Sequence, residues 1–134
     1  MNESDRFKAG AEVRRKLVGD SYAGAIKSKG SDLRAEFADA ATEHLWGASW
    51  TRPGLDMRSR SILTISLLLA KGHGSEDGLS LHLRGALRNN LLTLDEIMEL
   101  VLHSSIYVGY PTAKAAMRLA LRMLGTEEEP DHAR

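Results

Sequence analysis

Apolar residues recur every three or four positions along most of this chain, which is the spacing of one face of an α-helix. No segment alternates as a strand does, and no internal repeat is obvious. The pattern predicts helices over residues 6–18, 31–46, 56–71, 75–88 and 112–124, and one more that opens at Thr93 and breaks at Tyr110-Pro111. We therefore expect an all-α fold, a single domain of about six helices over residues 1–134, frayed at residues 1–5 and 126–134.

Turn-forming and capping residues set the expected ends of these helices. Gly47 is predicted to stop the second helix, because glycine accepts the left-handed conformation common there, and residues 48–55 then form a loop. Residues 72–74 and the pair Asn89-Asn90 are predicted turns. Side chains that can cap the following helices are Asp56, Ser75 and the capping box of Thr93 and Glu96.

The apolar stripes indicate where the core lies. The second helix carries apolar residues at spacings of four, namely Leu33, Phe37, Ala41 and Leu45. The helix over residues 56–71 is apolar around most of its circumference in its second half, so we expect it at the centre of the fold. The expected core stripe of the next helix is Leu79, Leu83, Ala86 and Leu87.

Composition excludes several function classes. The chain has 134 residues, 43% of them hydrophobic, and its 18 Lys and Arg balance 18 Asp and Glu. This balance gives no support for a nucleic-acid or anionic-membrane surface. No apolar run approaches the ~20 residues that cross a bilayer, and the first ten residues do not resemble a secretory signal, so we expect a cytoplasmic protein. The absence of cysteine excludes disulfides and thiol redox chemistry.

Histidines are the first candidates for chemistry. None of the five pairs with another at the i, i+4 spacing of two metal ligands on one helix, so no metal site is expected. His82 lies on the shoulder of a core stripe, where it is either a hydrogen-bonded core residue or a general acid/base. His103 precedes Tyr107 on one helix face; each is interpreted either as a packing residue or as part of a site.

Arginines gather in one short stretch. Arg52, Arg58 and Arg60 surround a turn that also holds Trp50 and Pro53. Exposed charges are usually only a solvated surface, but a guanidinium in this stiff apolar setting can hold a carboxylate through two hydrogen bonds. Successive positions on a helix point about 100° apart, so Arg58 and Arg60 cannot share a face. Only one of the two is therefore expected to face a site.

Three segments together carry a family resemblance. They are WTRPGLD at residues 50–56 with Trp46 before it, LHLRGALRN at 81–89, and IYVGYP at 106–111. With these segments the sequence resembles the carboxymuconolactone decarboxylase family over residues 10–124. The resemblance implies an alkylhydroperoxidase-D-like helical bundle that assembles into a homo-oligomer, a trimer or hexamer.

The wider family includes thiol peroxidases with a C-x-x-C pair followed by a histidine. His82 matches that histidine, but Ser75 and Gly78 stand at the two cysteine positions. Because neither residue can form a disulfide or attack a peroxide, thiol peroxidase activity is excluded.

The resemblance implies a lyase without a cofactor, which converts 4-carboxymuconolactone to β-ketoadipate enol-lactone in aromatic catabolism. By this resemblance Arg52, with Arg58 or Arg60, holds a carboxylate of the small anionic substrate, and His82 polarises the lactone oxygen or supplies the proton. Other residues expected to bind substrate or wall its pocket are Trp46, Trp50, His103 and Tyr107. Two alternatives stay open: a sister lyase or isomerase on another cyclic unsaturated acid, and a non-catalytic helical oligomer.

Overall fold

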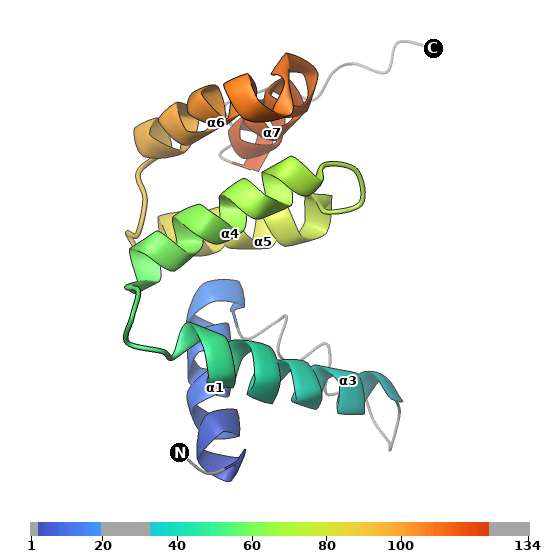
Figure 1. The fold of residues 1–134 in the computed structure, drawn as a ribbon, viewed down its shortest axis with the longest axis vertical. Helices are drawn as coiled ribbons and strands as arrows, with labels where there is room; N and C mark the ends of the chain where they lie inside the picture. Colours follow the sequence, from blue (N-terminus) through green and yellow to red (C-terminus); the bar gives the residue numbers. More distant parts are fainter. Residues whose placement is uncertain (1–2, 20–32, 124–134) are drawn as a thin grey trace. The chain divides into compact units, whose positions relative to one another are not determined.

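The structure is a computed structural model that describes residues 3–19 and 33–123. All regular structure in these two ranges is helical (Figure 1). The chain divides into two compact units, Met1–Arg60 and Ser61–Arg134. Within the described ranges, no helix is long and apolar enough to span a membrane.

The first unit is built on a close crossing of two helical segments. It contains α1 (Glu3–Val18), α3 (Leu33–Ala41) and η1, a π-helix over Thr42–Trp50 that continues α3. A Cβ atom on Gly10 of α1 would overlap the Thr42 carbonyl oxygen, and one on Gly47 of η1 would overlap the Arg6 carbonyl oxygen. The two backbones approach this closely only because both positions are glycine.

The sequence pattern predicted that Gly47 ends a helix, and this prediction is wrong. Gly47 lies buried inside η1, which continues to Trp50, so the expected loop begins at Thr51. The predicted helix over residues 31–46 is also not uniform, because it changes from α to π geometry at Thr42. Residues 31 and 32 lie outside the described ranges, as does Asp20 of the turn that follows α1.

A buried arginine links α1 to α3 and η1 through hydrogen bonds. Arg14 of α1 is 8% exposed and donates from Nη1 to the Thr42 hydroxyl at 2.6 Å and to the Ala38 carbonyl at 3.4 Å. Thr42 in turn donates to the Ala38 carbonyl at 2.8 Å. The buried face of α3 and η1 thus carries Ala38, Thr42 and Trp46. The leucines and phenylalanine of the stripe that the sequence suggested are exposed, at 80% for Leu33 and 78% for Phe37.

The second unit consists of α4 (Met57–Lys71, which begins in the first unit), α5 (Glu76–Arg88), α6 (Leu94–Val108) and α7 (Tyr110–Met123). Its core draws on all of these helices. The predicted α5 stripe is confirmed, since Leu79, Leu83 and Ala86 are buried and Leu87 packs against them. The remaining core members are Ile65, Leu69, Leu92, Ile97, Val101, Ala113, Ala116 and Ala120.

Helix α4 is less central than its composition predicted. Its face through Ser61, Ile65 and Leu69 is buried, but Leu63 and Leu67 are 50% and 61% exposed. An all-round apolar sequence therefore does not translate into all-round burial within this chain.

Two of the three predicted capping signals, at the starts of α4 and α6, are confirmed. Asp56 accepts from the Ser59 backbone N–H at 2.6 Å at the start of α4, and both hydrogen bonds of the Thr93–Glu96 capping box are present. Gly72 and Gly74 have positive φ in the α4–α5 turn. The break between α6 and α7 falls at Gly109, with φ of 89°, and not at Tyr110-Pro111, because proline is tolerated in the first turn of α7.

Candidate functional site

Two tryptophans occupy the π-helix of the first unit. Trp46 and Trp50 are 6% and 8% exposed, and their rings stack with centroids 5.2 Å apart and planes at 28°. A π-helix is rare and is found often at functional sites. The two predicted wall residues thus form one buried aromatic cluster, within a π-helix that the sequence pattern did not predict.

The loop after η1 separates the roles of two arginines. Arg60 donates from Nη2 to the Arg52 carbonyl at 2.8 Å and from Nε to the Leu55 carbonyl at 3.2 Å. Its guanidinium therefore holds the loop in shape. Arg52 is exposed, and its backbone N–H donates to the Ser49 carbonyl at 3.2 Å, so the guanidinium projects from an ordered backbone.

Arg58 lies in the first turn of α4, beside the capping carboxylate. The Ser59 backbone N–H, the Ser59 hydroxyl and the nearby Arg58 charge lower the pKa of Asp56. Arg58 itself is exposed. The sequence predicted that one of Arg58 and Arg60 faces a site. Arg60 is bound to the loop, whereas Arg58 lies at the surface beside a carboxylate.

His82 comes from the middle of α5 in the second unit. It is partly buried, and this burial lowers its pKa below the ordinary value of 6.5. Burial therefore favours the neutral form of the imidazole. A neutral ring can donate one hydrogen bond and accept another, which suits it to polarise a carbonyl oxygen.

His103 and Tyr107 form a pair on α6. Their ring centroids are 5.5 Å apart at 50°, as the i, i+4 spacing predicted. Both side chains are exposed, Tyr107 at 76%, and the neighbouring Tyr110 at 69% carries the Lys114 ammonium 5.9 Å from its ring centre. Neither tyrosine is therefore a core residue of this chain, and the role of Tyr107 at a site stays a prediction.

Ser75, at the first cysteine position of the peroxidases, has a structural role that the sequence did not predict. It precedes α5 as expected, but it makes no side-chain capping bond. Its hydroxyl instead lies 2.7 Å from the Leu68 carbonyl and 2.6 Å from the Gly72 carbonyl, at the end of α4. A single hydroxyl thus ties the end of α4 to the start of α5.

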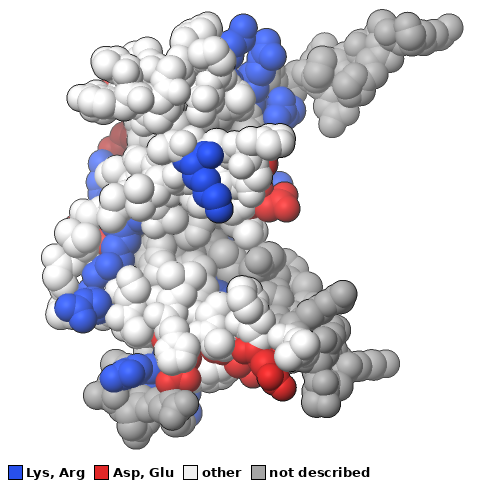
Figure 2. Space-filling model, turned by 45° about the vertical axis from the view of Figure 1, so that its right-hand side comes forward, with Lys and Arg blue, Asp and Glu red and all other residues white. Residues whose placement is uncertain are grey.

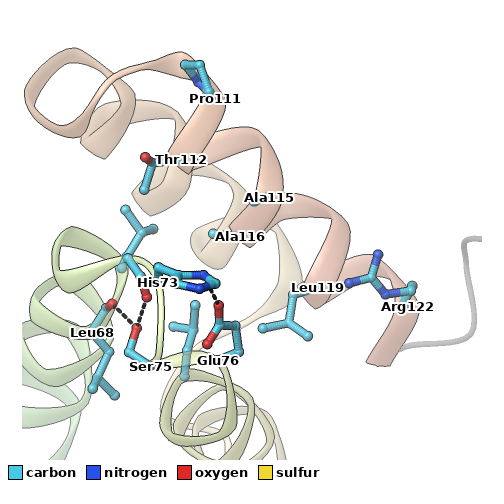
Figure 3. A pocket seen from close by; sticks show the side chains of 13 residues that line it. Leu68, His73, Ser75, Glu76, Pro111, Thr112, Ala115, Ala116, Leu119 and Arg122 are labelled. Atoms are coloured by element: carbon cyan, nitrogen blue, oxygen red, sulfur yellow. Dashed lines mark hydrogen bonds and ion pairs between the residues drawn. The ribbon is translucent and has the colours of Figure 1, made fainter.

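A cavity of about 450 Å³ lies in the second unit, between the α4–α5 turn and α7 (Figure 3). None of the predicted site residues lines it. Its formation depends on small side chains on α7, where Ala115 and Ala116 leave space opposite Leu68 and Leu79. The adjacent alanines at 115 and 116 were the signal that the sequence analysis did not use.

The structure brings the predicted residues together in groups within each unit. In the first unit Trp46 stacks on Trp50, and Arg60 binds the backbone of Arg52. In the second, His103 contacts Tyr107 on α6, and His82 stands on α5. Within the described ranges no three His, Asp or Glu side chains are arranged to hold a metal ion.

These features define a class: small all-helical proteins that carry aromatic, arginine and histidine side chains suited to an organic anion. Comparison with known proteins makes the class specific. The family model for the carboxymuconolactone decarboxylase family matches residues 35–122, and the chain belongs to this family.

Relatives with assigned activities extend this result. The chain is 41% identical over 120 residues to 4-carboxymuconolactone decarboxylase of Acinetobacter baylyi, which covers 90% of this chain and 87% of that protein. It is 37% identical over 111 residues to a nitrosuccinic acid decarboxylase of Metarhizium robertsii, covering 83% and 76%. Both relatives are named as decarboxylases, so carboxy-lyase activity is the common element.

Proposed function

We propose that this protein is a decarboxylase that converts 4-carboxymuconolactone to β-ketoadipate enol-lactone without a cofactor. The observation that carries the proposal is the 41% identity to a 4-carboxymuconolactone decarboxylase over nine-tenths of the chain. The proposal places the enzyme in the cytoplasm, in aromatic catabolism.

The substrate itself can accept the electron pair that CO2 leaves behind, so the proposed reaction needs no cofactor for this purpose. The departing carboxylate is attached to a carbon that is conjugated through a double bond to the lactone carbonyl. When CO2 leaves, the electron pair of the broken C–C bond moves through this double bond onto the carbonyl oxygen and forms a dienolate. One proton from solvent, added to carbon, then completes the enol-lactone. The protein must stabilise the oxygen's negative charge and hold the second carboxylate.

Arg52 is assigned to the second carboxylate. Its guanidinium is exposed, and its backbone is fixed by the hydrogen bond from Arg60. A fork of N–H donors on a rigid loop can bind a carboxylate with little loss of side-chain freedom. Arg58 is the better second anchor, because Arg60 uses its donors on the loop. The stacked Trp46 and Trp50 would supply an apolar wall.

His82 is assigned to the lactone carbonyl oxygen. Two roles were open to it, polarising this oxygen or delivering the proton. The lowered pKa favours the neutral ring, and a neutral imidazole is a poor proton donor but a good hydrogen-bond donor to a developing oxyanion. His103 and Tyr107 stay in the proposal as substrate-binding residues.

The test is a direct ultraviolet assay of lactone consumption, with CO2 measured in parallel. We expect loss of the lactone chromophore with one CO2 released per lactone. His82→Ala is expected to lower kcat roughly 100- to 1000-fold, the cost of losing one oxyanion donor. Wild-type turnover in His82→Ala would exclude a role for this residue in the mechanism. A wild-type protein without activity would exclude 4-carboxymuconolactone as its substrate.

A second candidate substrate comes from the Metarhizium relative. Nitrosuccinate also carries two carboxylates, and a nitro group beside the departing one can accept the electron pair as a lactone carbonyl can. The same assay should therefore include nitrosuccinate. A larger kcat/KM for nitrosuccinate than for the lactone would make this protein the sister lyase. Binding of either dianion without CO2 release would indicate a non-catalytic member of the family.

A further inference from the structure

None of the residues assigned to the decarboxylase site lines the cavity between the α4–α5 turn and α7. We propose that it is a second ligand site, which binds a small carboxylic acid with an apolar body. Its volume of about 450 Å³ falls in the range of small-molecule sites, about 300–1,000 Å³. The inference does not depend on the proposed reaction.

The walls of the cavity fit the body of such a ligand. Leucine side chains come from three helices, with Leu68 on α4, Leu79 on α5 and Leu119 on α7. Ala115 and Ala116 form the recessed part between them (Figure 3). An apolar chain or ring placed here would remove its own surface and that of the leucines from water.

The wall on the side of the turn is fixed by its own hydrogen bonds. The Ser75 hydroxyl is within hydrogen-bond distance of two carbonyls, and the Gly74 N–H donates to Glu76 Oε2 at 2.9 Å. Glu76 Oε1 also lies 3.5 Å from Nδ1 of the exposed His73. The carboxylate of Glu76 is therefore engaged at the turn, and its pKa is lowered by hydrogen bonds from its own backbone N–H and from Gly74 and by His73.

The charge that we propose for the ligand is inferred from Arg122. This residue lines the cavity one turn beyond Leu119 on α7 and is exposed (Figure 3). Among the described residues no carboxylate forms an ion pair with it. The Glu76 carboxylate is held at the turn by the Gly74 N–H, so Arg122 on α7 is the charged side chain of the lining that is complementary to a ligand anion. A carboxylate at Arg122 and an apolar body against the leucines satisfy both features.

The experiment measures binding of octanoate to the intact protein by calorimetry or ligand-observed NMR, with octanamide as the uncharged probe. We expect octanoate to bind at least several-fold more tightly than octanamide. Arg122→Gln should weaken octanoate binding roughly tenfold, as for loss of a charge-assisted hydrogen bond, and leave octanamide unchanged. Arg118→Gln, an exposed arginine of the same helix that does not line the cavity, is the matched control.

Filling the cavity is the second arm. Ala115 is exposed, so Ala115→Phe should block binding of both probes without disturbing the core, and Ala115→Leu serves if the larger side chain lowers the melting temperature. Equal octanoate affinity in wild type, Arg122→Gln and the filled variant would overturn the proposal, as would no octanoate binding at all. Decarboxylation by Arg122→Gln should equal wild type, so failure of this site and failure of the proposed reaction are distinguishable.

Discussion

Individual residues with the same chemistry have different roles in this structure. Arg60 binds two loop carbonyls, Arg52 presents its guanidinium outward from that loop, and Arg14 is buried against Thr42. The sequence showed a cluster of arginines but could not divide their roles, because each role depends on backbone carbonyls several residues away.

Arg52 and Arg60 should separate cleanly in mutagenesis. Arg52→Ala should raise KM roughly tenfold through loss of a charged hydrogen bond to substrate, with an unchanged free energy of unfolding. Arg60→Ala should lower the free energy of unfolding by about 1 kcal/mol, because two loop carbonyls lose their donor. Steady-state kinetics and urea unfolding of both variants check this. A raised KM in Arg60→Ala without any stability loss would reverse the two assignments.

His82 predicts how stability depends on pH. Burial lowers its pKa in the folded protein below the unfolded value of 6.5, so the unfolded chain binds a proton more readily. Its contribution to stability is complete above pH 6.5 and is lost as pH falls from there through the folded pKa. Melting temperatures between pH 5 and pH 8 measure this loss. His82→Gln should flatten this part of the curve, whereas His44→Gln, an exposed histidine, should leave it unchanged.

The same property predicts the pH dependence of turnover. If neutral His82 polarises the substrate oxygen, kcat should rise as pH increases through the pKa of His82 in the substrate complex and stay high above it. If the charged ring delivered the proton, kcat would fall over the same range. A pH–rate profile from pH 5 to pH 8 therefore distinguishes the two roles.

At the scale of elements, most of the local features were predicted from the sequence, although the Ser75 cap and the helix break at Tyr110-Pro111 were not confirmed. The start of α4 at Asp56, the capping box of α6 and the core stripe of α5 were all readable, because each depends on residues within one or two turns. Gly47 was misread as a helix end. Its glycine serves the approach of α1, a contact between segments far apart in the chain.

The helix crossing can be tested with single methyl groups. Gly10→Ala or Gly47→Ala should each lower the free energy of unfolding by about 2 kcal/mol or more, because the added Cβ would meet rigid backbone. Gly54→Ala is the matched control, since no atom lies within 4 Å of its Cβ position and its φ is not positive. It should change stability by less than about 0.5 kcal/mol. Thermal or urea unfolding measures all three, and tolerance of alanine at Gly10 would contradict the close crossing.

For the whole molecule, neutrality and an exposed apolar face are the main features. In Figure 2, side chains of Lys and Arg and side chains of Asp and Glu are both visible among uncharged residues. On α6 and the start of α7, Leu102, Ile106, Tyr107 and Tyr110 are 60% to 77% exposed. Together they expose roughly 500 Å² of largely apolar surface, counting about 200 Å² for a tyrosine ring. Patches of this size often mark an interaction site.

This face is smaller than the roughly 800 Å² that a stable interface covers on each partner, so we propose it as the apolar centre, and not the whole, of the homo-oligomer interface that the family resemblance implies. Ile106→Lys should shift the protein to a smaller species at micromolar concentration and leave helix content unchanged. Light scattering coupled to size-exclusion chromatography measures the shift, and Arg84→Glu, an exposed change on α5, is the control. A wild-type monomer at that concentration would contradict the assembly.

The α4–α5 turn also bears on how this chain lost, or never had, a thiol site. At Gly78 a Cβ would meet only the two methyl carbons of Leu68, at 3.6 Å, which is ordinary contact. A cysteine there would fit, and Ser75 is already the oxygen counterpart of the other cysteine. Nothing in the packing of the turn therefore keeps the dithiol out. By the resemblance drawn from the sequence, the side chains at Ser75 and Gly78, and not the packing around Gly78, are therefore what separates this chain from a thiol peroxidase.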